Sequence, residues 1–522
     1  MKRRLLVLAA FTTAMGAVAQ YEDEWKASPM KPFSGVEYKA EMQLSGSSGK
    51  TPLWLNANKY GLSSLDEFNG YVRGSIERPL SVDENRKWGL GYGADVAVPV
   101  NYTSHFVVQQ AYVEGRWLHG VLTVGAKEYP MDLKNNQLST GSQTLGKNAR
   151  PVPQVRLALP EYWTLPFGHG WLHLKGHVAY GVMTDDNWQH DFTGRKSKYA
   201  DNVRYHSKAG YLKISNEERF IPWSFEMGLE MAAEFGGTSH AFSSKGEEAI
   251  REGEKGFKGM WHALLPGGDE VGESTYLNVA GNTLGSWVAR IGYEADTWKF
   301  AFYADKYFED HSGMLMLDYD GYGTGQEWAV KKERKYLIYD PKDWLLGVEL
   351  NYKYDRLVKG IVLEYLYSKY QSGPIYHDHN PGMKDHIGGI DEFYNHYIYT
   401  GWQHWGQVMG NPLYRSPIYN DDGAIMVKNN RFMAFHLGIN GTPTEQLRYR
   451  LLATYQDGLG TYQVPFKSRH QNFSFLAEAD YAFKGKLAGW NLRGAYGMDL
   501  GGLLGHNYGF QLTLSKKGVI TK

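Results

Sequence analysis

The feature that most constrains this chain is an alternation of apolar and polar residues with a period of two. Apolar side chains alternate with charged or polar ones from Val36 to Leu44, and a longer run extends from Trp223 to Phe235. A period of two is typical of a β-strand with one apolar face. The sequence therefore predicts an all-β protein. Similar runs occupy 90–100, 172–182, 287–296, 346–354, 447–456, 473–483, 491–499 and 508–514.

Two kinds of all-β protein show this alternation. In a soluble β-sandwich the apolar face is buried in the core, whereas in a transmembrane β-barrel it faces lipid. Many runs here reach about 9–11 residues, which is enough to cross a membrane at a tilt. These features favour a closed antiparallel transmembrane β-barrel. Aromatic residues at the ends of runs favour it too, as at Trp223, Phe235, Trp287, Trp344, Trp490 and Phe510.

The N-terminus has the three parts of a secretory signal peptide. Positive charges at 2–4 precede an apolar run at 5–18, and Ala-Val-Ala at 17–19 has the small residues of a cleavage site. The apolar run is shorter than the roughly 20 residues that a membrane-spanning helix needs. We therefore predict a signal peptide at 1–19.

Charge and cysteine content exclude several classes of function. Lys and Arg together number 56, as do Asp and Glu, so there is no positive field that would hold nucleic acid. Without the three cations of the predicted signal peptide, 53 cations face 56 anions and the net charge is −3. The chain has no cysteine, which excludes disulfides, thiol nucleophiles and thiolate metal sites.

The mature chain divides into a short N-terminal periplasmic segment at 20–35 and a barrel at 36–522. At roughly 28 residues per strand and connection, we expect about 16–18 strands. Short turn signals lie at 81–87, 355–360 and 484–486, as periplasmic turns would. Other connections are long and rich in Gly, Asn, Pro, His and aromatic residues, which predicts extracellular loops. They are 128–170, 184–220, 236–285, 306–343, 371–430 and 457–470.

Several of these connections resemble a known family. Residues 138–146 read LSTGSQTLG and residues 148–156 read NARPVPQVR, which is similar to the capsule assembly Wzi family in its Bacteroidetes branch. Further stretches agree in the same order along most of the mature chain. They are PLWLNAN at 52–58, YGVMTDDNW at 180–188, NTLGSW at 282–287 and GNPLY at 410–414.

The resemblance implies an outer-membrane barrel of a Gram-negative cell that binds exported capsular polysaccharide at the cell surface and supports capsule assembly or attachment. It implies no catalysis and no cofactor. The partners to expect are capsular polysaccharide, outer-membrane lipid and the capsule export machinery, and no nucleic acid. The chain departs from the family where only Tyr21 to Ser34 precede the first strand. This interval is too short for the N-terminal helical bundle of enterobacterial members, so we expect no such plug on the periplasmic side.

A polysaccharide site needs aromatic rings for the CH-rich faces of sugars, beside polar groups that bind hydroxyls. The densest aromatic and polar stretch is 391–415, in which Trp402 and Trp405 are the foremost candidates. The alternative is that these rings pack the loops together or lie in the interfacial belt. The remaining candidates are Tyr394, Tyr397, Arg415, Trp188, Trp261 and Asp186.

Metal binding and catalysis are two further possibilities for the polar residues of the loops. Histidines in the loops have no fixed helical spacing, so we expect no metal site among His377, Asp378, His379, His386, His396 and His404. A hydrolase would need acids and a base that converge in space, and neighbours in a loop do not show this for Asp185, Asp186 and His190, or for Asp421 and Asp422. We therefore expect no enzyme.

The serious alternative is an outer-membrane porin or a substrate-specific channel for saccharides. Its wet lumen would be lined by inward-facing polar residues of the strands, which would fit equally well in a closed barrel whose interior charges pair with one another. These residues are His173, Lys175, His177, Glu226, Glu230, Glu234, Arg493 and Asp499.

Overall fold

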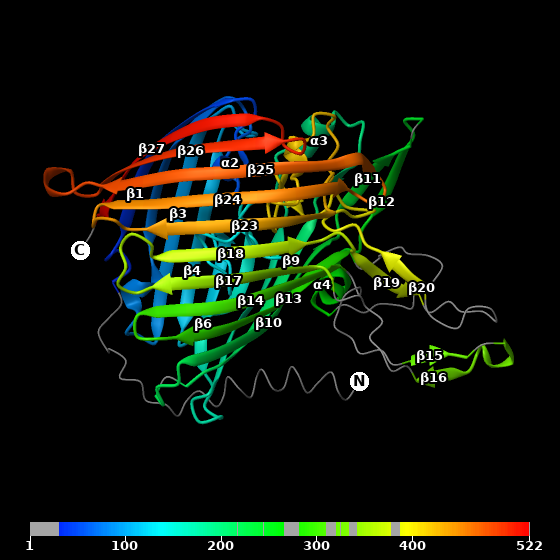
Figure 1. The fold of residues 1–522 in the computed structure, drawn as a ribbon, viewed down its shortest axis with the longest axis horizontal. Helices are drawn as coiled ribbons and strands as arrows, with labels where there is room; N and C mark the ends of the chain where they lie inside the picture. Colours follow the sequence, from blue (N-terminus) through cyan, green and yellow to red (C-terminus); the bar gives the residue numbers. More distant parts are fainter. Residues whose placement is uncertain are drawn as a thin grey trace.

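Eighteen antiparallel strands pair edge to edge into a sheet that closes on itself, because β1 pairs with both β2 and the last strand, β27 (Figure 1). This confirms the predicted barrel and its strand number. The computed structural model describes residues 31–216, 218–243, 245–265, 281–309, 320–323, 325–333, 342–376 and 387–520. The predicted signal peptide at 1–19 and most of the segment at 20–35 lie outside these residues. Within them, no helix has the length and apolar character needed to cross a membrane.

The barrel strands are long and follow one another around the wall, apart from elements inserted in the loops. They are β1 Glu37–Ser48, β2 Phe68–Arg78, β3 Trp88–Val100, β4 Val107–Trp117, β5 Gly120–Ala126, β6 Gln154–Thr164, β7 Leu172–Val182, β9 Arg204–Ile214, β10 Trp223–Phe235, β13 Asn282–Glu294, β14 Trp298–Glu309, β17 Trp344–Tyr352, β18 Gly360–Tyr367, β23 Phe432–Gly441, β24 Leu447–Gly460, β25 Pro465–Ala482, β26 Trp490–Gly501 and β27 Asn507–Val519.

The connections carry short helices and small separate sheets. The helical elements are α2 Leu53–Asn56, η2 Leu80–Asp83, α3 Trp188–Thr193, α4 Gly256–Leu264, η3 Gly325–Glu327, η4 Pro417–Tyr419 and η5 Gly485–Leu487. The additional strands are β8 Tyr199–Asp201, β11 Thr238–Phe242, β12 Glu248–Glu252, β15 Asp320–Tyr322, β16 Lys331–Glu333, β19 Ser372–Tyr376, β20 Ile387–Ile390, β21 Gln403–His404 and β22 Gln407–Val408.

Three of the predicted loops include residues that form barrel strands in the structure. The predicted loop at 128–170 contains β6, the one at 184–220 contains β9, and 457–470 holds only a short connection between β24 and β25. In β6 the alternation is interrupted because the register with β7 shifts between Leu159 and Trp163. Such a bulge turns side chains to the other face and hides the strand from a period-two search.

The two ends of the barrel differ. All three predicted short turns lie at one end, on the left of Figure 1, where the C-terminus also lies. The long connections, with α3, β11 and β12, lie at the opposite end. Barrels of outer membranes have short periplasmic turns and longer extracellular loops. The long-loop end is therefore the extracellular end.

Side chains alternate between lipid and lumen as the sequence predicts. On β1, Met42 and Leu44 are exposed on the outer wall, whereas Gln43 and Ser45 are buried inside. Exposed apolar side chains continue around the outer wall, which identifies the membrane-spanning band of an outer-membrane protein. One predicted girdle residue is an exception: Phe235 is buried at the extracellular end of β10, because α4 covers it.

Candidate functional site

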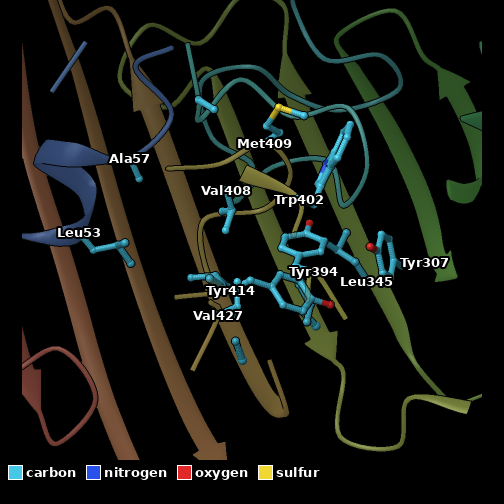
Figure 2. Close-up of a cluster of buried hydrophobic side chains, with 14 of the residues drawn as sticks. Leu53, Ala57, Tyr307, Leu345, Tyr394, Trp402, Val408, Met409, Tyr414 and Val427 are labelled. Carbon is cyan, nitrogen blue, oxygen red and sulfur yellow. The ribbon is translucent and has the colours of Figure 1, made fainter. Parts of the chain in front are cut away.

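Extracellular loops fold back into the barrel and fill the extracellular half of its lumen. Segments 49–67, 127–153 and 391–431 contribute most of one buried apolar cluster, which also includes inward residues of the barrel strands. Figure 2 shows this cluster, with Leu53 and Ala57 of the first segment on one side and Trp402, Val408 and Tyr414 of the third at its centre. We call these three segments the plug.

Polar side chains of the strands hold the plug in place. Glu364 on β18 accepts hydrogen bonds from Ser139 Oγ (2.5 Å), Thr140 N (2.7 Å) and Thr140 Oγ1 (2.7 Å). Glu230 on β10 accepts one from Ser142 Oγ (2.9 Å). Glu230, one of the inward acids that the sequence could assign to a wet lumen, therefore binds the plug instead. The bound residues belong to 138–146, one of the stretches that carry the resemblance described above.

Two of the predicted sugar contacts, Trp402 and Tyr394, are buried inside this plug. Trp402 is 1% exposed, stacks on Tyr205 with ring centroids 6.0 Å apart, and donates from Nε1 to Thr144 O (2.9 Å). Tyr394 is also 1% exposed and packs on Tyr414, with ring centroids 4.1 Å apart. Trp402 therefore presents no exposed indole to a ligand, because the loop that carries it turns into the lumen, as the alternative of loop packing predicts.

Three more candidates are wholly or partly engaged in packing. Trp188 is buried on α3 and stacks on Phe192, with ring centroids 4.9 Å apart. The half-buried Trp405 lies under Arg150, whose Cζ is 4.1 Å from the ring centroid. Arg415 donates from Nη2 to Tyr419 O (2.9 Å). These side chains stabilise the loops, and only Trp405 and Arg415 keep part of their surface exposed.

The last three candidates are exposed but lie in different surroundings. Tyr397 accepts a hydrogen bond from Arg251 Nη2 (2.9 Å) beside β12. Asp186 lies in the turn before α3, and Trp261 lies on α4. Of the eight predicted residues, Trp402, Tyr394 and Trp188 are therefore buried, and the other five are at least partly exposed.

The loop histidines and acids have structural partners. Burial lowers the pKa of His396 to about 3 and that of His404 to about 4, so both are neutral. His377, Asp378, His379 and His386 lie outside the described residues. Within the described ranges, no group of three or more His, Asp or Glu side chains could hold a metal ion. Asp421 pairs with Lys50 (2.6 Å) and Asp422 with Lys428 (2.6 Å).

A different cluster at the extracellular end combines aromatic and polar groups. It lies on the outer face of a small sheet in which β11 pairs with both β8 and β12, in the loops before β9 and before β13. The rings of Tyr199 and His240 stack with centroids 4.5 Å apart, and His190 of α3 meets Tyr199 edge-on at 4.6 Å. We call this cluster the outer platform. Its members are His190, Tyr199, Asp201, His240, Phe242 and Glu248.

The platform is held by contacts between imidazoles and carboxylates. His190 Nε2 lies 2.8 Å from Asp201 Oδ1, and His240 Nδ1 lies 2.6 Å from Glu248 Oε1. Both carboxylates remain partly exposed, with side-chain exposures of 33% and 40%. Carboxylates accept hydrogen bonds from hydroxyls, and the half-buried Phe242 presents ring surface beside them. The platform thus has the chemistry of a sugar contact.

Sequence reasoning missed this cluster because its residues come from separate loops. The sequence singles out only His190 of its members, as part of a catalytic alternative with Asp185 and Asp186. The structure pairs His190 with Asp201 instead. The strand pairing between Thr238 and Asp201 that brings the loops together is long-range, and no local pattern predicts it.

The periplasmic half of the lumen is polar and open to water. A cavity of about 350 Å³ lies below the plug, with Arg448 and Arg493 exposed in its walls. Several wall charges are paired, for example Arg450 with Glu478 (3.2 Å). Burial lowers the pKa of Lys59, which the plug contributes to this cavity, to about 7. The barrel therefore has a wet vestibule on one side and a packed plug on the other.

Comparison with known proteins supports the fold. No family model and no curated protein matches the sequence. The structure is similar to that of Wzi from Escherichia coli, an outer-membrane protein involved in group 1 capsule assembly and a carbohydrate-binding β-barrel, with a TM-score of 0.55, 12% identity and coverage of 94% of this chain and 85% of that one. OprD of Pseudomonas aeruginosa aligns with a TM-score of 0.46 and 8% identity over 97% of this chain and 100% of that one.

Proposed function

We propose that this protein binds exported capsular polysaccharide at the cell surface and supports the assembly or attachment of the capsule, without catalysing a reaction. The observation that carries the proposal is the plug. Because the long loops fill the extracellular half of the lumen, they offer a ligand from outside only their outer surface. On that surface the outer platform supplies two partly exposed carboxylates, the imidazoles of His190 and His240 and the half-buried ring of Phe242. Tyr199 is 6% exposed and packs against both imidazoles.

Two further observations support the proposal. The fold is shared with Wzi of Escherichia coli, a carbohydrate-binding barrel. The loop segments of this chain that resemble the Wzi family include 138–146, part of which Glu364 and Glu230 bind at the centre of the plug. Contacts with the capsule export machinery belong to the same proposal.

A saccharide channel is the second candidate, and the wet vestibule of about 350 Å³ favours it. Such a channel would need the plug to move aside. The buried apolar cluster and the hydrogen bonds of Glu364 favour a plug that stays in place. Conductance across a planar bilayer distinguishes the two, because a closed barrel passes little current and an open one passes a steady current.

Deletion of the gene followed by complementation tests the proposal in the cell. We expect deletion to release capsule into the medium while polysaccharide synthesis continues, because the protein would retain polymer instead of making it. Complementation with Asp201→Asn and Glu248→Gln together should restore retention less well than the wild type. As a matched control, Asp421→Asn removes an exposed carboxylate at the same end of the barrel and should restore retention fully.

Two outcomes would contradict the proposal. Loss of polymer synthesis on deletion would point to a role before export. Slower uptake of a defined oligosaccharide, with the capsule unchanged, would identify the protein as a channel.

A further inference from the structure

The helix α4 lies against the outside of the barrel wall. Its buried residues Gly259 and Ala263 face β9 and β10, and Ala263 packs with Ala233 and Phe235 of β10. Glu230 of β10 faces inward, since it binds Ser142 of the plug, and the other even-numbered residues of this strand share its face. In a strand, successive side chains alternate between the two faces, so Ala233 and Phe235 point outward. They are nevertheless buried, because α4 covers them.

Polar groups of the wall fix the helix in this place. Tyr180 on β7 donates from its hydroxyl to Met260 O (2.8 Å). Lys208 on β9 donates to Ala263 O (3.1 Å) and to Leu264 O, and so satisfies carbonyls at the C-terminus of the helix. A lysine on the lipid-facing wall is destabilising when uncovered. The helix therefore both covers the polar outer face of β9 and is held by it.

The opposite side of α4 is apolar and exposed. Phe257, Trp261 and Leu265 are 79%, 40% and 47% exposed. Residues four apart lie on the same side of a helix, so Phe257 and Trp261 form one stripe that points away from the wall. Leu265 follows directly at the C-cap of the helix. The rings of Phe257 and Trp261 lie parallel, with centroids 6.4 Å apart. We call these three residues the α4 stripe.

The register of the strands places α4 at the height of the membrane band. Tyr180, which binds the helix, pairs with Val155 of β6, and Val155 is exposed on the outer wall. Val182 lies two residues further toward the extracellular end of β7 and is also exposed and apolar. The lipid-facing surface thus extends at least as far as the residues on which α4 rests.

We propose that α4 is an interfacial anchor whose apolar stripe inserts among the acyl chains of the outer leaflet, beside the barrel. An amphipathic helix that lies in the interface with its apolar face in the acyl region behaves in this way. Trp261 is then a membrane contact and not a sugar contact. The inference rests on the position of the barrel in the membrane and is independent of the proposed polysaccharide binding.

The absence of cysteine from the chain makes a direct test possible. Nitroxide labels are attached at Phe257→Cys and, in a separate variant, at Trp261→Cys, and the barrel is reconstituted in vesicles of phosphatidylethanolamine and phosphatidylglycerol. Collision with oxygen reports lipid, and collision with a water-soluble nickel chelate reports water. Phe225→Cys on the lipid-facing wall gives the lipid reference, and Ile250→Cys, an exposed apolar position on β12, gives the aqueous reference.

We expect both α4 labels to collide several-fold more with oxygen than with the nickel chelate, as the label at 225 does. Heat-dependent gel migration checks that each labelled barrel is folded. If the labels at 257 and 261 are as accessible to the nickel chelate as the label at 250, α4 lies in water and the proposal fails. It also fails if purified capsular polysaccharide, added from outside, shields the label at 261.

Discussion

Replacing Trp402 by alanine separates two roles for this residue, a packing residue of the plug and a contact for sugar. The side chain is 1% exposed, and truncation of a buried Trp costs about 3–5 kcal/mol. The change also removes the donor to Thr144 O, which leaves a buried carbonyl without its partner at a cost of about 1–3 kcal/mol. Since the two terms overlap, we expect the plug to lose about 4 kcal/mol of stability.

The loss should be local, because the ladders of the 18-stranded wall do not depend on this indole. Limited proteolysis of the folded, heat-resistant variant should cut within 391–431 much faster than in the wild type, and planar-bilayer recordings should show a current that the wild type lacks. Trp402→Phe is the matched control: it keeps a ring against Tyr205 but loses the N–H, and should lose only about 1–2 kcal/mol. Normal protease resistance and conductance in Trp402→Ala, together with weakened polysaccharide binding, would refute a packing role.

Three further predictions concern the wall and the plug. Leu229→Arg places a charge on the lipid-facing side of β10 and should destabilise the barrel by about 2–4 kcal/mol in urea unfolding from vesicles. Changes at Glu230 should also be costly, because it binds Ser142. An unaffected unfolding midpoint in Leu229→Arg would contradict the lipid-facing position. Glu364→Ala removes the acceptor for the 139–140 segment, so proteolysis within 127–153 should accelerate; equal cleavage rates in wild type and variant would show that this anchor is dispensable. Burial lowers the pKa of His404 from about 6.5 to about 4, so protonation of this imidazole favours the opened loop. The stability of the plug should be full above pH 6.5 and fall by up to about 3 kcal/mol as the pH drops to 4. His404→Gln should flatten the pH dependence of proteolysis.

Local alternation predicts most of the wall, because along many strands exposed apolar side chains alternate with inward polar ones. It fails for β9, where the outward residues Arg204, His206 and Lys208 are polar. These positions do not need to be apolar, because α4 shields part of this face from lipid and its Ala263 carbonyl accepts a hydrogen bond from Lys208. The helix α4 follows β9 by some 50 residues in the sequence. Because α4 covers these positions, β9 lacks the apolar alternation that would have identified it as a strand.

The site was less predictable than the wall for a related reason. Composition shows that the loops are rich in indole and phenol rings, but it cannot show whether a loop turns outward or into the lumen. Trp402 and Tyr394 turn inward and form the plug, whereas Tyr397, close to them in sequence, remains exposed. The outer platform depends on pairing between β8 and β11, which joins loops that are separated by the strands β9 and β10.

The most direct test of the account is a binding isotherm of the purified barrel, reconstituted in vesicles, with the capsular polysaccharide of its own host. We expect saturable binding of the wild type. Binding should be weakened about tenfold by Asp201→Asn with Glu248→Gln, since each lost hydrogen bond contributes about 0.5–1.5 kcal/mol, and it should not change with Asp421→Asn. Absence of binding by a folded wild-type barrel would contradict the central claim, and undiminished binding by the platform variant would remove the outer platform from the site.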